Sequence, residues 1–360
     1  MVNIVSFPGL GLEFTINRIA FEIFGIQVYW YGLIIGVGFL LALLYAFSRV
    51  KTFGLDGDRL VDVIIGGTIG GIIGARLYYV IFSWDHYKDN LKEIFMLSHG
   101  GLAIYGGIIG ALLVGVLMCR WRKVRILPTL DLVMGCFLLG QGIGRWGNFM
   151  NVEAYGCNTD LPWGMTSPKI VSELINKSAE LQAQGITVDP TAPVHPTFFY
   201  ESVWCLLGFL LVVLYTKHRR FDGEITLLYL IWYGAERAVV EGLRTDSLMW
   251  GGIRVSQILS IILAVAGLGV WIWLRVRIRS MDPAQRPVLY ANTQESRWIV
   301  AGEYDYATGT KKESSEKQEE LPVSNAQDEA ESPAGETELS QPQSSPALKD
   351  TDSQETPSDQ

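Results

Sequence analysis

The sequence predicts an all-α, polytopic integral membrane protein with seven transmembrane helices and a disordered acidic tail. Three observations support this fold class. The 360 residues are 49% hydrophobic and include 38 Gly and 11 Trp, which is unusually apolar for a soluble chain of this length. Seven apolar runs are long enough to cross about 30 Å of hydrocarbon. Residues 288–360 carry 16 acidic and 5 basic residues, whereas the rest of the chain carries 21 acidic and 24 basic residues.

The seven predicted spans form one membrane domain over residues 1–287. They cover residues 28–47, 60–82, 100–118, 128–147, 197–215, 225–240 and 255–274. The sixth is short, so we expect its polar end to lie in the interface or in a protein cavity. Overlapping small-xxx-small spacings, such as Gly70 with Gly74 and Gly106 with Gly110, predict close approach of helix backbones.

Basic residues predict the orientation of these spans. The loops after spans one, three, five and seven carry 14 Lys and Arg, whereas the opposite loops carry 7. Because Lys and Arg accumulate in cytoplasmic loops, we expect the N-terminus outside and the C-terminus in the cytoplasm. The loop region 148–196 is then extracytoplasmic. Residues 288–360, rich in Ser, Glu, Gln and Pro, are expected to form a disordered acidic cytoplasmic tail.

The four cysteines favour neither a disulfide framework nor a metal site. They show no C-x-x-C spacing, and they lie mostly in or beside apolar segments: Cys119, Cys136, Cys157 and Cys205. Each is interpreted as a small buried hydrophobic residue. No glycine loop of the phosphate-cradling type is present either. We therefore expect no metal, no other cofactor and no nucleic-acid partner.

The segment from Gln141 to Glu153 places polar and charged residues at the end of the fourth span. On a helix, Gln141, Arg145 and Asn148 fall at i, i+4 and i+7 and share one face. A charged side chain at membrane depth is costly and is usually retained for a function. This face is therefore predicted to contact an anion.

Polar residues of other spans are predicted to lie at a similar depth. At about 1.5 Å per residue, Arg76, Arg145 and Arg237 lie roughly 24, 26 and 18 Å from the cytoplasmic ends of their helices. Polar or aromatic residues also stand near the outer starts of spans one, three and five: Tyr31, His99, Tyr105, His195, Tyr200 and Glu201. Each arginine could instead form a structural ion pair, as Arg237 could with Glu241 four residues on. Tyr31 could equally belong to an interfacial aromatic belt.

Three intramembrane arginines with few carboxylates nearby favour a lipid phosphate as the ligand. Arginine suits bidentate phosphate contacts, and phosphates are the abundant anions at that depth.

Five segments resemble those of the bacterial phosphatidylglycerol–prolipoprotein diacylglyceryl transferases, in the same order over roughly residues 20–280. They are Trp30–Gly32, Gly100–Gly107, Gly144–Gly156, His195–Glu201 and Arg237–Glu241. The resemblance implies a multi-pass enzyme of the bacterial cytoplasmic membrane. It would transfer the diacylglyceryl group of phosphatidylglycerol to the lipobox cysteine of a prolipoprotein signal peptide, forming a thioether and releasing glycerol phosphate. This is the first step of lipoprotein maturation, with membrane lipid and prolipoprotein as partners.

The resemblance also implies the site residues. Those expected to be catalytic are Arg145, Asn148, Glu153, Arg237, Glu241 and Tyr105. Those expected to bind phosphatidylglycerol are Arg145, Tyr31, Arg76, Gly156, His195, Glu201 and Arg244. Arginines aimed at the departing phosphate would stabilise its developing charge.

The base for the thiol stays open in the sequence. Many members of the family that this chain resembles carry histidine where this chain has Tyr105. Glu241, Glu201, His195 and Tyr105 are candidates, or the arginine field alone lowers the pKa of the thiol.

Two other functional classes are weaker interpretations. An anion transporter or channel would also carry intramembrane charges, but the sequence shows no internal repeat and its charges crowd one leaflet. A scaffold that binds partners through its acidic tail would leave the arginines without a purpose.

Overall fold

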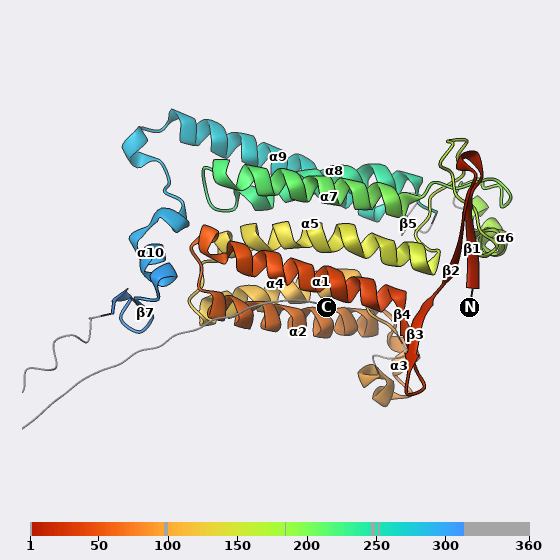
Figure 1. Ribbon diagram of the computed structural model, residues 1–360, viewed down its shortest axis with the longest axis horizontal. Coiled ribbons are helices and arrows are strands. Elements are labelled where there is room, and N and C mark those ends of the chain that lie inside the picture. Colours follow the sequence, from red (N-terminus) through yellow and green to blue (C-terminus); the bar gives the residue numbers. More distant parts are fainter. Residues whose placement is uncertain (1, 97–99, 184, 246–248, 251–252, 313–360) are drawn as a thin grey trace, which may run out of the picture. The chain divides into compact units, whose positions relative to one another are not determined.

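The structure, a computed structural model, describes residues 2–96, 100–183, 185–245, 249–250 and 253–312. Within these residues the chain is mostly helical and contains four two-stranded antiparallel hairpins. The long helices run side by side in Figure 1, and the hairpins and short helices lie near their ends. His99, one of the polar residues of the third predicted span, lies outside the described residues.

Among the described residues, six helices are long and apolar enough to cross a membrane. They are α1 (Trp30–Arg49), α2 (Gly57–Phe82), α4 (Ile104–Trp121), α5 (Ile126–Asn151), α7 (Thr197–Tyr215) and α9 (Val255–Ser280). Each coincides with a predicted span. Many of their large apolar side chains are exposed, which suits hydrocarbon better than water. The protein is therefore a multi-pass membrane protein.

The sixth predicted span is also helical, as α8 (Glu224–Leu243), but its composition differs from that of the other six. It carries four charged residues: Glu224, Glu236, Arg237 and Glu241. The helix packs against α5, α7 and α9. Neighbouring helices, rather than lipid, therefore surround much of α8. Its crossing of the membrane stays a prediction.

Helix α5 lies at the centre of the packing. It contacts α1, α7 and α8, with a smaller contact to α4, while α2 packs mainly on α4 and α9 on α8. Glycines allow the tight α2–α4 pair. A Cβ added to Gly74 would lie 2.4 Å from the carbonyl oxygen of Gly106, and one added to Gly110 would lie 2.2 Å from that of Gly70. The predicted small-residue packing is confirmed for this pair.

The all-α prediction did not include four short hairpins, which form in the loops between and beyond the spans. The pairs are β1 (Val2–Phe7) with β2 (Leu12–Asn17), β3 (Ile19–Ile23) with β4 (Ile26–Tyr29), β5 (Met249–Trp250) with β6 (Ile253–Arg254), and β7 (Tyr304–Asp305) with β8 (Thr310–Lys311). Short alternating runs give a much weaker sequence signal than a 20-residue apolar run, and so they were missed.

The region 148–196, expected as a loop, contains a helix and part of a second apolar core. Helix α6 (Pro168–Ala183) packs on β1, and Ser6 forms a β-bridge with Thr166. The core joins the first hairpin to this region through Val5, Ile16, Ile170 and Leu174. Burial of these side chains, remote in sequence, makes the region a folded lobe attached to the bundle.

The predicted start of disorder at Val288 is also wrong. Residues 288–312 contain the helical turn η7 (Tyr290–Asn292), helix α10 (Gln294–Ala301) and the β7–β8 hairpin. Tyr290 and Ser296 are buried, and Ser296 donates to the carbonyl of Gly54 in the loop between α1 and α2. Tertiary contacts therefore order a segment whose composition alone suggests a tail. The rest of the predicted tail, residues 313–360, lies outside the described residues.

Short helical turns occupy several of the remaining loops. They are η1 (Pro8–Leu10), η2 (Val50–Phe53), α3 (Trp84–Tyr87), η3 (Leu91–Phe95), η5 (Thr216–His218) and η6 (Pro283–Gln285).

Candidate active site

Glu201 is the centre of a charged cluster where α5, α7 and α8 meet. Its side chain is completely buried on the first turns of α7. Its Oε2 pairs with Arg145 of α5 and, at 3.2 Å, with Arg237 of α8, and its Oε1 lies 3.5 Å from Arg244. One carboxylate thus faces three guanidinium groups. Arg145, Glu201, Arg237, Arg244 and Glu241 are called the Glu201 cluster below.

Glu241 completes this cluster from the last turn of α8. It pairs with Arg237 across one helical turn, as the i, i+4 spacing predicts, and it is buried. Its backbone carbonyl also accepts from Arg254, next to the start of α9. The ion pairs therefore connect α5, α7 and α8, and the Arg254 hydrogen bond joins the start of α9 to them.

These contacts correct one expectation from the sequence. Arg145 and Arg237 are not short of carboxylates, because Glu201 and Glu241 pair with them. The shared use of Glu201 nevertheless leaves more guanidinium donors than carboxylate oxygens, since each arginine has five N–H donors. The acids hold the guanidinium groups in place, and the cluster still has N–H groups that can donate hydrogen bonds to an anion.

Helix α5 ends in a turn that holds Glu153 beside two asparagines. Asn148 and Asn151 donate to Glu153 Oε1 at 2.9 and 3.2 Å. The turn places Val152 at φ 51° and Ala154 at φ 56°, in the left-handed region that non-glycine residues seldom adopt. Such backbone strain concentrates at functional sites. The predicted site residues Asn148 and Glu153 are therefore neighbours in a strained, rigid turn.

Tyr31 packs on the same part of α5. A Cβ added to Gly147 would lie 3.0 Å from Tyr31 Cδ2, so glycine lets the ring lie against the helix backbone. The tyrosine is within electrostatic range of Glu153 and Arg145. Tyr31 thus belongs with the residues at the end of α5 rather than only with an aromatic belt.

Gly156 lies where three chain segments cross. Its N–H donates to the His195 carbonyl at 2.9 Å, and it forms a β-bridge with Arg244. An added Cβ would lie 2.8 Å from His195 Cβ and 3.1 Å from the carbonyl oxygen of Leu243. The bridge anchors the backbone that carries Arg244. Only glycine permits this close approach without displacement.

His195 precedes α7 and lies beside the lobe that contains α6. Its Nδ1 lies 3.2 Å from the Tyr200 hydroxyl, which accepts from Trp163 at 2.7 Å. Partial burial lowers the pKa of His195, which favours the neutral imidazole. No contact among the described residues joins this ring to the Glu201 cluster. Its backbone positions Gly156, whereas its expected contact with phosphatidylglycerol stays a prediction.

Tyr105 and Arg76 contact other parts of the bundle. The Tyr105 hydroxyl lies 2.7 Å from Ser256 Oγ of α9. Arg76 donates to the carbonyls of Ile94 at 2.8 Å and of Gly100 at 2.6 Å. It donates to further carbonyls in the same loop, and these bonds favour a role for Arg76 in shaping the loop before α4.

Sequence reasoning missed Glu236, which directly precedes Arg237. It is 4% exposed, and neither carboxylate oxygen has a hydrogen-bond partner among the described residues. The available signal was a second acid inside a short apolar span, where every ionisable residue is a candidate functional group.

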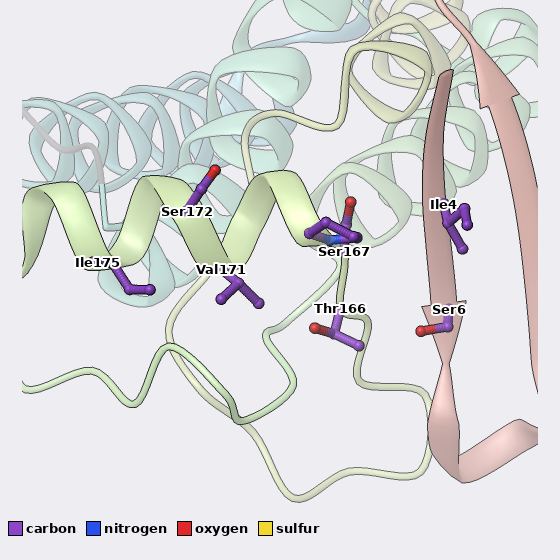
Figure 2. A pocket seen from close by; sticks show the side chains of 8 residues that line it. Ile4, Ser6, Thr166, Ser167, Val171, Ser172 and Ile175 are labelled. Atoms are coloured by element: carbon purple, nitrogen blue, oxygen red, sulfur yellow. The ribbon is translucent and has the colours of Figure 1, made fainter. Parts of the chain in front are cut away.

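A groove elsewhere in the molecule lies between β1 and the start of α6 and has a volume of about 440 Å³ (Figure 2). Its lining contains no charged side chain: Ile4, Ser6, Thr166, Ser167, Pro168, Val171, Ser172 and Ile175. None of the predicted site residues lines it. A groove without a cation does not suit a lipid phosphate, so the Glu201 cluster is the better candidate site.

Known proteins resemble this chain over most of its length. The family model described as prolipoprotein diacylglyceryl transferase matches residues 18–273, which include every element of the cluster. A phosphatidylglycerol–prolipoprotein diacylglyceryl transferase of Finegoldia magna is 44% identical over 253 residues, 70% of this chain and 93% of the relative. One of Listeria innocua is 41% identical over 265 residues, 73% of this chain and 91% of the relative. One of Staphylococcus xylosus is 44% identical over 254 residues, 70% of this chain and 87% of the relative.

The family match runs from residue 18 to residue 273, within α9, and the candidate site lies inside this range. The chain therefore belongs to the prolipoprotein diacylglyceryl transferase family.

Proposed function

We propose that this chain transfers the diacylglyceryl group of phosphatidylglycerol to the lipobox cysteine of prolipoproteins, and that the Glu201 cluster binds the lipid phosphate. The observation that carries the proposal is one buried carboxylate shared by three arginines from two helices and the turn after α8. Holding guanidinium groups in fixed positions before the substrate arrives is how sites stabilise charge that develops in the transition state.

The chemistry needs such a site. When sulfur attacks the glyceryl carbon, the bond from that carbon to the phosphate oxygen breaks and negative charge moves onto the departing phosphate. Arg145 and Arg237 can bind that oxygen bidentately while Glu201 fixes their planes. Asn148 of α5, Glu153 in the turn after it and Tyr31 of α1, which packs on Gly147, would then position the glycerol part of the headgroup. The same positive field would favour thiolate at the lipobox cysteine.

The membrane placement belongs to the same proposal. The excess of Lys and Arg in one set of loops puts the cluster in the outer half of the bacterial cytoplasmic membrane, with seven crossings and the C-terminus in the cytoplasm. The crowding of α8 charges among other helices, rather than in lipid, allows it to be the seventh crossing.

A mass assay tests the function. Membranes containing the protein, given phosphatidylglycerol and a lipobox peptide, should add one diacylglyceryl mass to the peptide. Arg145→Ala and Arg237→Ala should abolish the addition in protein that still inserts and folds. Equal modification of a peptide with Ser in place of the lipobox Cys would refute the thiol mechanism.

A further inference from the structure

Each side chain that the sequence offers as a base for the thiol proton already forms an ion pair or a hydrogen bond with another side chain. Glu201 and Glu241 form ion pairs with arginines of the cluster. The Tyr105 hydroxyl is bonded to Ser256 on α9, and His195 is bonded to Tyr200 outside the cluster. A different group is needed if a side chain takes this proton.

Glu236 is a buried carboxylate that is not engaged in this way. It is 4% exposed, and both of its oxygens lack a hydrogen-bond partner among the described residues. Burying a carboxylate without hydrogen bonds costs several kcal/mol, which a purely structural residue would have no reason to incur. Within a spanning bundle such a group is a functional candidate.

Its position on α8 directs it toward the Glu201 cluster. Tyr229 lies seven residues earlier on the same helix face, and its hydroxyl is bonded to Gln141 of α5 at 3.1 Å. Glu236 is therefore on the α5-facing side, about 10 Å further along the helix. Four residues beyond Gln141, α5 carries Arg145. The charges that act on Glu236 are indeed those of Arg145, Glu201, Arg237 and Arg244.

We propose that Glu236 is the proton acceptor of the transfer reaction, taking the proton of the lipobox thiol directly or through one water. This assignment rests on the proposed function. The S–H bond breaks and its proton goes to a Glu236 oxygen, while the sulfur electron pair forms the C–S bond to the glyceryl carbon. The C–O bond to phosphate breaks, and its electron pair leaves on the phosphate oxygen. The proton then passes from Glu236 to the released glycerol phosphate or to water.

The test compares two peptides that differ in one atom at the nucleophile. A selenocysteine peptide ionises at a much lower pH than the cysteine peptide and has little need of a base. Glu236→Gln should lower kcat for the cysteine peptide by about 100- to 10,000-fold, the usual range for loss of a general base. The KM for phosphatidylglycerol should stay unchanged, and the loss with the selenocysteine peptide should be less than about 10-fold. Glu236→Asp, which keeps a carboxylate, should recover part of kcat.

The pH profile gives an independent reading. The acid limb of kcat for the cysteine peptide should disappear in Glu236→Gln. The other titratable and charged groups that face Glu236 are Glu201 and Cys205 of α7, Arg145 of α5, and Tyr229, Tyr233, Arg237 and Arg244 of α8 and its end. All of these remain in the variant. A limb that persists unchanged would therefore contradict the assignment.

Glu224→Gln is the matched control, since it makes the same change in another buried acid of the same helix. It should lower thermal stability and leave the ratio of the two peptide rates unchanged. Equal losses of Glu236→Gln on both peptides, or none, would overturn the proton-acceptor role while the wild-type protein remains active. A wild-type protein that modifies neither peptide would overturn the proposed function, and this assignment with it.

Discussion

The two ends of α8 bury carboxylates in opposite ways. At the start of the helix, Glu224 is fully buried, and it accepts from Tyr215 at 2.9 Å, from Trp271 at 3.0 Å and from Arg275 at 2.6 Å. Near the end of the helix, Glu236 is almost as buried and accepts from no group among the described residues. Glu224 is thus satisfied, whereas Glu236 on the same helix is not.

The neighbours of these acids follow the same division. Asp131 of α5, near Glu224, accepts from the backbone N–H groups of Gly223 and Thr226 at 2.8 and 2.9 Å. At the other end, one carboxylate of Glu201 is shared by three arginines. A satisfied network stabilises and specifies the fold, whereas an under-satisfied one leaves capacity for a ligand. The first turns of α8 are therefore interpreted as structural and its last turns as functional.

The largest effect that this comparison predicts comes from removing the guanidinium fork near the end of α8. Arg237→Lys and Arg145→Lys keep the charge but lose bidentate geometry, so turnover should fall by about 100- to 1,000-fold. Thermal unfolding in detergent should change little. Turnover close to that of the wild-type protein in either variant would contradict the division between the two ends.

The C-terminal segment gives a second prediction, at the end of the bundle where α8 begins. Residues 288–312 form three hydrogen bonds to the loops of the bundle. The Tyr290 N–H donates to Asp222 at 2.8 Å, Arg125 donates to Glu295 at 2.7 Å, and the Tyr306 hydroxyl donates to Asp56 at 2.9 Å. Deleting 313–360 should leave stability and activity unchanged. Deleting 288–360 should lower the melting temperature by about 5 °C or more, equivalent to roughly 2 kcal/mol, with the specific activity of folded protein retained. Identical melting temperatures for the two truncated proteins would show that these contacts contribute nothing to stability.

Asp131→Asn tests the structural role of the acids near the start of α8, and its expected effect is smaller. Asparagine has a single acceptor oxygen in place of two, so Gly223 or Thr226 loses its partner. An unsatisfied buried donor costs about 1–3 kcal/mol, and this loss should appear as a lower denaturation midpoint. The kcat of the protein that remains folded should stay within about two-fold of wild type, because surface and structural changes remote from a site act mainly on stability. A large fall in kcat with normal stability would place Asp131 in the functional half.

The smallest predicted effect concerns pH and His195. Burial lowers its pKa below the ordinary 6.5, so the unfolded chain binds this proton more readily than the folded protein. The stability associated with the neutral ring is then present above pH 6.5 and is lost as pH falls toward the lower, folded pKa. His195→Gln should therefore show a smaller drop in melting temperature between pH 7.5 and pH 5.5 than wild type. An identical drop in both proteins would mean that another group is responsible.

Several elements could be predicted because their signals are local. Apolar runs of about 20 residues predicted the spanning helices, and the i, i+4 spacing predicted the Arg237–Glu241 pair, which is confirmed. Glycines spaced by four predicted the close α2–α4 contact. The hairpins, α6 and the order of residues 288–312 were missed, because contacts with segments far away in sequence stabilise them.

The site shows the same limit. Depth along each helix predicted that Arg76, Arg145 and Arg237 lie in the same half of the membrane, but depth does not give the direction in which a side chain points. Arg76 is bonded to loop carbonyls, while the other two meet at Glu201. The sequence also offered Tyr105 and His195 as candidate bases, and their partners on α9 and in the lobe become visible only in the folded chain.

The sequence alone determined the membrane class, the helices and the group of residues in which the site lies, because hydrophobic runs and helical periodicity depend only on neighbours along the chain. The tertiary structure decided which charges pair, which arginine stays outside the site and which carboxylate is left without a partner. Those outcomes depend on how the helices rotate and pack against one another, and the amino-acid sequence alone does not give the distances between helices.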